Sequence, residues 1–219
     1  MIEALLSALS RIADLGGPVI LVLLAVAVAS GAVMLYKLWQ FAAAGVGRHR
    51  ALGRAIDAWD RGDRTAAREA LSASRSYLAP VVEMALSAPD APEAQTRLTA
   101  EAEARFAGLE RGLRFLDIVA QLAPLLGLFG TVLGMIEAFR SLQEAGAQVD
   151  PSILAGGIWV ALMTTAAGLA VAMPVALVLS WFEGRMDGER VLAERAIATI
   201  RAPMGGRTMQ AAPAAAAHA

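Results

Sequence analysis

Three long runs without a charged residue constrain this chain more than any other feature: 18–35, 118–136 and 151–182. A bilayer core is about 30 Å thick and a helix rises about 1.5 Å per residue, so about 20 apolar residues cross it. The first two runs fit one crossing each, and the third is too short for two crossings and a turn. The sequence therefore predicts an all-α membrane protein with three transmembrane helices.

Composition excludes several classes of function. The chain is 57% hydrophobic and 18% charged, its net charge is −1 and it has no cysteine. A general nucleic-acid binder needs a basic excess, and a disulfide or thiolate metal site needs cysteine. The sequence contains no phosphate-binding loop, nucleophile elbow or HExxH motif. No enzyme activity, cofactor or metal site is predicted, and His49 and His218 are interpreted as solvated side chains.

The distribution of basic residues predicts the orientation. The segment before the first run has one basic residue, Arg11, and the loop between the second and third runs has only Arg140. The segment from Lys37 to Arg114 holds most of the 19 lysines and arginines, and further arginines follow the third run. Because basic loops stay in the cytoplasm, we expect an inner-membrane protein with a periplasmic N-terminus and a cytoplasmic C-terminus.

One alternative concerns the first run. The small residues at 25–30 are similar to a signal-peptidase site, although the segment ahead lacks the usual positive charge. Cleavage would also place the arginine-rich segment outside, against the charge rule. We therefore retain the first run as a membrane helix. The predicted segments are 1–16 periplasmic, 17–41 first span, 42–114 cytoplasmic helical segment, 115–140 second span, 141–152 periplasmic loop, 153–182 third span, 183–201 cytoplasmic helix extension and 202–219 disordered tail.

The cytoplasmic segment is predicted to be helical with breaks. Turns are expected at 60–63 and 88–92, and a weak point before Pro80. From Glu93 onward one apolar stripe continues to the second span without a helix breaker, so the second span is expected to extend a cytoplasmic helix. The third span is expected to continue likewise. Charges of both signs alternate on these helices, which predicts a solvated, salt-bridged helical bundle. The stripe consists of Leu98, Ala102, Phe106, Leu109, Leu113 and Leu116.

Small and polar residues recur at helical spacing inside the second and third runs. Small side chains let helix backbones approach closely in lipid, so packing is the preferred interpretation of the glycines. A threonine hydroxyl either bonds the carbonyl one turn back or lines a polar path, and both interpretations remain open. The residues are Gly127, Thr131, Gly134 and Ala138 in the second run and Gly157, Ala161, Thr164, Thr165, Gly168 and Ala172 in the third.

These runs resemble the membrane spans of the MotA/TolQ/ExbB proton channel family. Residues 123–135 read APLLGLFGTVLGM, similar to the second span of ExbB and TolQ, and residues 157–169 read GIWVALMTTAAGL, similar to their third. Pro174 occupies a position where the family also has a proline. The likeness is specific over 117–183 and extends to layout elsewhere. The three-span layout is similar to ExbB and TolQ, whereas MotA has four spans. Within the family the chain is most similar to ExbB, with TolQ a close second.

The resemblance implies a subunit of a motor driven by the proton-motive force. Such subunits form a homo-pentameric ring around a single-span ExbD/TolR-like partner, which brings a membrane aspartate. The complex energises TonB-dependent transport or Tol–Pal function through TonB or TolA. Thr131 and Thr165 match the family's pore-facing threonines, and Thr164 is a neighbour expected to share that role. The expected helix-packing residues are Gly127, Gly130, Gly134, Gly157, Gly168, Pro124 and Pro174. Of these, contacts between copies are expected at Gly130, Gly134, Gly157 and Gly168.

One departure from the family pattern keeps a second hypothesis open. Many relatives carry a glutamate where this chain has Val160, and the three runs contain no ionisable residue. Ionisable groups inside membranes usually mark proton pathways, so the chain cannot relay protons alone. Either the partner supplies the carboxylate, or the chain is a non-conducting scaffold that stabilises a partner complex. The sequence leaves open the coupling ion (H⁺ or Na⁺), the process energised and the stoichiometry.

Overall fold

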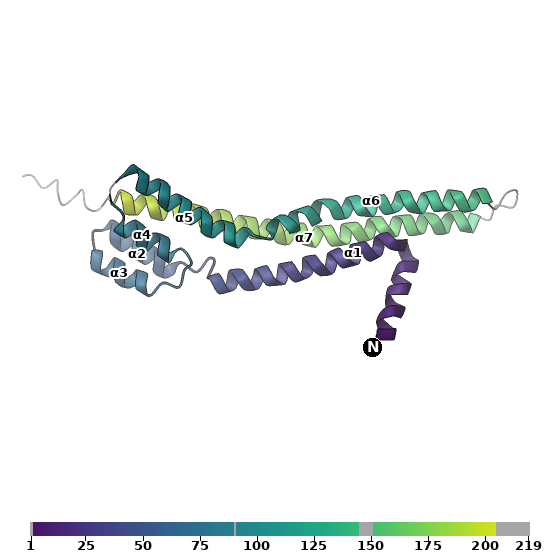
Figure 1. Ribbon diagram of the computed structural model, residues 1–219, viewed down its shortest axis with the longest axis horizontal. Coiled ribbons are helices and arrows are strands. Elements are labelled where there is room, and N and C mark those ends of the chain that lie inside the picture. The colour runs from purple at the N-terminus through teal and green to yellow at the C-terminus, as the bar shows by residue number, and fades with distance from the viewer. Residues whose placement is uncertain (1, 90, 145–150, 205–219) are drawn as a thin grey trace, which may run out of the picture. The chain divides into compact units, whose positions relative to one another are not determined.

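The computed structural model describes residues 2–89, 91–144 and 151–204, with side chains throughout these ranges except for residues 2–16, 151 and 153. Over these residues the chain is all-helical, and no strand occurs in the described ranges (Figure 1). The helices are α1 (Ile2–Ala44), α2 (Arg50–Asp60), α3 (Arg64–Ser72), α4 (Ala79–Ser87), α5 (Pro92–Glu110), α6 (Leu113–Glu144) and α7 (Pro151–Arg201).

Three of the described helices are long and apolar enough to cross a membrane. These candidate spans are Gly17–Ala44, Leu113–Glu144 and Leu154–Arg201. The predicted all-α fold with three transmembrane helices is thus confirmed. The chain divides into two compact units, which we call the membrane unit (1–37 and 112–181) and the α2–α5 unit (38–111 and 182–219). Helices α1 and α7 contribute residues to both units.

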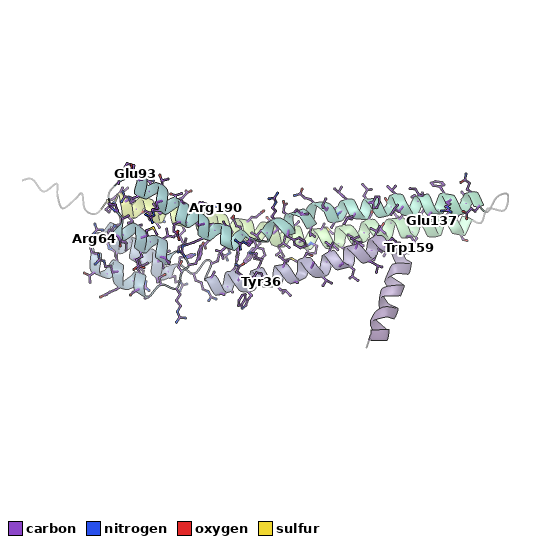
Figure 2. The ribbon with its side chains drawn as sticks, viewed as in Figure 1. Tyr36, Arg64, Glu93, Glu137, Trp159 and Arg190 are labelled. Carbon is purple, nitrogen blue, oxygen red and sulfur yellow. The ribbon has the colours of Figure 1, made fainter. Side chains whose placement is uncertain are left out.

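In the membrane unit, small residues are buried between the helices and many large apolar residues are exposed. Ala123 on α6 and Ala161 and Ala172 on α7 are at most 5% exposed. Trp159, whose side chain Figure 2 labels, is 60% exposed. Such an apolar surface suits contact with lipid or with another membrane helix, because exposing it to water is unfavourable. The large exposed side chains include Leu125, Leu128, Phe129, Ile136, Leu162 and Leu177.

The α2–α5 unit has a core of its own. Predicted stripe residues Leu98, Ala102 and Phe106 of α5 are all buried. Phe41, at the end of α1, and Phe182 of α7 pack edge to face with their ring centroids 4.9 Å apart. Helix α3 starts where the side chain of Asp63 accepts a hydrogen bond from the backbone N–H of Ala66, at 3.0 Å. That contact satisfies one of the unpaired donors at a helix start.

The expected unbroken helix from Glu93 into the second span is wrong. Helix α5 ends at Glu110 and α6 begins at Leu113. Between them Gly112 has a φ of +95°, a left-handed conformation that glycine adopts without steric cost. The apolar stripe does not indicate this break, because Leu109 before it and Leu113 after it are both buried. Helix α7, by contrast, runs without interruption from Pro151 to Arg201.

Some expectations fall outside the described residues. These are the middle of the predicted periplasmic loop at 145–150, the greater part of the predicted tail at 205–219, and His218 within it. The sidedness of the membrane spans, with the N-terminus in the periplasm, stays a prediction from the charge rule.

Candidate functional site

The glycines predicted to pack helices lie at the interface between α6 and α7. A Cβ atom added to Gly127 would lie 2.8 Å from the backbone oxygen of Thr164, and one added to Gly130 would lie 2.7 Å from the Cβ of Thr164. A Cβ on Gly168 would lie 3.0 Å from the Cα of Gly127. Real Cβ atoms do not approach other heavy atoms so closely, so these positions admit glycine and little else. The two backbones therefore approach as closely as small residues allow.

The same interface continues toward the 138–157 end of the two helices. A Cβ on Gly134 would lie 3.3 Å from the Cα of Ala161, and one on Gly157 would overlap the Cβ of Ala138. All five glycines thus pack α6 against α7 within a single chain. The expected use of these small faces in contacts between copies stays a prediction. The close approach is needed first to hold the two long helices of one chain together.

The three candidate threonines differ in where their hydroxyl groups bond. Thr131 is half-buried and donates to the carbonyl of Leu128 at 2.6 Å, within α6. Thr164 is fully buried and donates to Ala161 at 2.7 Å, within α7. Thr165 is half-buried and donates to the carbonyl of Gly127 on the other helix at 3.4 Å. Two threonines therefore keep partly exposed side chains, and one does not.

Thr164 fits a packing role better than an ion pathway. Its side chain has no exposed surface and lies directly against Gly130. Its hydroxyl is satisfied by its own helix, which needs no functional explanation. The geometry therefore favours packing for Thr164, and its expected share in the ion pathway stays a prediction.

The two prolines sit inside helices. Pro124 in α6 is half-buried and Pro174 in α7 is exposed. A proline has no N–H, so the carbonyls of residues 120 and 170 lose their usual helical donor. Val160, in place of the family's glutamate, is half-buried and apolar. The side chains along the uncharged runs of α6 and α7 thus offer neutral polar groups rather than charges.

A second polar cluster, in the α2–α5 unit, was not foreseen. Glu189 on α7 accepts hydrogen bonds from three donors, and both of its carboxylate oxygens are used. Its Oε1 accepts from His49 Nε2 at 2.7 Å and from the backbone N–H of Gly47 at 2.8 Å, and its Oε2 accepts from the Tyr77 hydroxyl at 2.7 Å. The other ring nitrogen of His49 lies 2.9 Å from the Ser76 hydroxyl oxygen.

This cluster corrects the interpretation of His49 as a solvated side chain, because its side chain is only 11% exposed. Burial alone would raise the pKa of Glu189, but the hydrogen bonds from His49, Tyr77 and Gly47 outweigh burial and hold that pKa below its ordinary value. Burial and the hydrogen bond to Glu189 raise the pKa of Tyr77, so its hydroxyl stays a donor. Glu189 and its donors thus form a charge-assisted, nearly dry contact.

The sequence did contain a signal for Glu189. Residues 182, 186, 189, 193 and 197 recur at spacings of four and three, which places them on one face of a helix. Within the described part of α7 beyond 181, that face is buried and Glu189 is its one buried charge. A charge on a buried stripe requires a partner, so this spacing predicts a polar contact for Glu189.

Comparison with known proteins gives a consistent result. Residues 63–195 match the MotA/TolQ/ExbB proton channel family. The biopolymer transport protein exbB1 of Vibrio cholerae is 49% identical over 63 residues, 29% of this chain and 28% of that protein. A putative biopolymer transport protein ExbB homolog of Methanothermobacter thermautotrophicus is 46% identical over 81 residues, 37% of this chain and 28% of that protein.

The Tol–Pal system protein TolQ of Haemophilus influenzae is 40% identical over 94 residues, 41% of this chain and 41% of that protein. Each of these matches spans less than half of the relative's own length. The family assignment rests on the longer match at 63–195, which contains the whole α6–α7 interface.

Proposed function

Because the chain belongs to the MotA/TolQ/ExbB proton channel family, we propose that it is the inner-membrane subunit of a motor driven by an ion gradient. In this proposal it works with an ExbD/TolR-like single-span partner, and the complex energises TonB-dependent transport or Tol–Pal function. The named relatives are biopolymer transport and Tol–Pal proteins, which supports both possibilities.

One observation carries the proposal. Helices α6 and α7 are packed by glycines, yet Thr131 and Thr165 keep partly exposed side chains among residues with no charge. Their hydroxyls bond backbone carbonyls, and the contact from Thr165 is long at 3.4 Å. A threonine hydroxyl can exchange its bond to a backbone carbonyl for a bond to water at little cost, because a carbonyl oxygen and a water oxygen are similar acceptors.

The missing charge defines the partner. No residue in the three uncharged runs can bind or release a proton near the middle of the membrane. A conducting complex therefore requires a carboxylate from another chain, and the proposed partner supplies it as an aspartate on its membrane helix. The Thr131 and Thr165 hydroxyls, with water, complete the path to that aspartate. Several copies of this chain, five in the proposed ring, surround the partner helices.

Copurification tests this assembly. The full chain, carrying an affinity tag, is expressed with its own genomic neighbours and extracted in mild detergent, and the mass of the intact complex is measured. We expect five copies of this chain with a second protein that has one membrane helix, an aspartate on that helix and a periplasmic domain. Recovery of the chain alone, or with a partner lacking any membrane carboxylate, would favour the scaffold alternative.

A further inference from the structure

We propose that His49 and Glu189 form a proton-responsive latch that joins the connection after α1 to α7 and tightens when His49 gains a proton. The latch consists of Gly47, His49, Ser76, Tyr77 and Glu189. It concerns control of the α2–α5 unit and goes beyond ion conduction, so it stands or falls separately from the proposed function.

The latch is built into the core of its unit. Glu189 is 4% exposed and Ser76 is 5% exposed. His49 and Glu189 are separated by 140 residues along the chain, so their contact brings together the connection between α1 and α2 and the C-terminal part of α7. Gly47 has a φ of +79°, which lets its N–H point at the carboxylate. A buried carboxylate without these donors would be costly.

With a neutral imidazole, the polar groups of the latch are all satisfied. In the tautomer that carries its proton on Nε2, His49 donates from Nε2 to Glu189 and accepts from the Ser76 hydroxyl at Nδ1. Ser76 also accepts a hydrogen bond from the backbone N–H of Leu78 at 3.2 Å. With neutral His49 the hydrogen-bond network is therefore complete and the latch is closed. The carboxylate of Glu189 is then its one charged group.

A proton added to His49 strengthens the contact with Glu189 and reverses the direction of the hydrogen bond with Ser76. Both ring nitrogens then donate, Nε2 to Glu189 and Nδ1 to the oxygen of Ser76, whose own hydrogen rotates away. The bond to Glu189 becomes an ion pair across 2.7 Å. A hydrogen bond between two ionised groups is roughly twice as strong as a neutral one, and a nearly dry site screens it little.

Other charged groups around the latch are themselves paired or exposed. Arg190, next to Glu189 on α7, is held by Glu110 of α5 at 2.7 Å and by Glu103 at 3.7 Å. Arg105 of α5 binds the backbone oxygen of Tyr77 and the carboxylate of Glu101.

The remaining arginines near the latch act on His49 differently. The guanidinium of Arg185 on α7 lies over Gly47, and Arg48 and Arg50, which flank His49, are exposed. These three cations oppose a proton on His49, whereas Glu189, in direct contact, favours it. Glu189 is the nearest of these charges and is in direct contact with His49.

Accessibility of the α1–α2 connection tests the latch. The chain has no cysteine, so Val46→Cys creates a single thiol beside Gly47. Thr99→Cys, on the exposed surface of α5, is the matched control for the effect of pH on thiol reactivity. Labelling rates by a soluble maleimide are measured on the full chain in detergent at about pH 6 and about pH 8.

The ratio of the rate at position 46 to that at position 99 should fall at least about twofold from pH 8 to pH 6, since a stronger contact opens less often. In His49→Gln, which keeps a donor but cannot gain a proton, the ratio should not change with pH. In Glu189→Gln, a protonated His49 has no carboxylate to pair with, so the ratio should not fall at pH 6 either. This variant provides the test if His49→Gln does not fold. A ratio independent of pH in the parent chain, or an equal response in either variant, overturns the proposal.

Discussion

Thr165 on α7 donates its hydroxyl to the carbonyl oxygen of Gly127 on α6, across 3.4 Å. The other two candidate threonines bond within their own helices at 2.6 and 2.7 Å. A bond at 3.4 Å is near the limit for a hydrogen bond and contributes little to stability. Thr165 is therefore the threonine whose hydroxyl is freest to serve a second partner, and its removal should not unfold the helix pair.

The α6–α7 interface predicts a sharp difference between two glycines of α7. Gly168→Ala should lower the free energy of unfolding by about 1–3 kcal/mol, because the new methyl group meets backbone atoms of α6 that cannot move aside. Gly156→Ala is the matched control, since nothing lies within 4 Å of its added Cβ. Thermal unfolding in detergent measures both. Equal midpoints for the two variants would contradict the assigned packing.

The break between α5 and α6 predicts a second matched pair. Gly112→Ala should destabilise the chain by about 1–2 kcal/mol, because alanine at a φ of +95° is strained. Gly108→Ala, two residues before the end of α5 in an exposed helical position, should stabilise by about 1 kcal/mol. Unfolding midpoints of both variants would be compared with the parent. If Gly112→Ala were also stabilising, the helix would be continuous there.

The charge on Glu189 predicts a dependence of stability on acid pH. Its pKa is lowered in the folded chain, so its ionised form stabilises the fold above its ordinary pKa of 4.5. That contribution is lost as the pH falls below 4.5 and through the lower, folded value. Glu189→Gln should therefore unfold a few degrees below the parent at pH 7, and the difference should shrink once the pH falls below 4.5. A difference that keeps growing below pH 4.5 would contradict the assigned contact.

The charge distribution predicts the sidedness of the membrane unit. Gln143→Cys, exposed at the end of α6, should react with a membrane-impermeant maleimide in intact spheroplasts, because residues 141–152 are expected in the periplasm. Thr65→Cys, exposed on α3, should react only after the membrane is disrupted. The opposite pattern would reverse the orientation.

Much of this architecture could be predicted from the sequence. Uncharged length fixes the three spans, and two short motifs around Gly127 and Gly168 were enough to identify the family, which the match at 63–195 confirms. Small residues at helical spacing also predicted close packing. They could not say which helix they face, because a small face fits a second helix of the same chain as well as another copy.

Two features escaped prediction for physical reasons. The pair His49–Glu189 joins residues 140 positions apart, and local periodicity carries no information on such contacts. The break at Gly112 depends on a backbone conformation that glycine permits but does not require. An isolated glycine inside a helical pattern is commonly tolerated, so Gly112 alone does not predict a break where the apolar stripe continues.

The central claim is that Thr131 and Thr165 serve ion movement rather than packing. The double variant Thr131→Val/Thr165→Val keeps the side-chain shape while removing both hydroxyls. Membrane hydrogen bonds average only about 0.6 kcal/mol in double-mutant cycles, so assembly should survive. In a deletion strain, we predict that this variant copurifies with its partner at the parent's yield but fails to restore energy-dependent uptake or envelope integrity. Full restoration by the double variant would contradict the account.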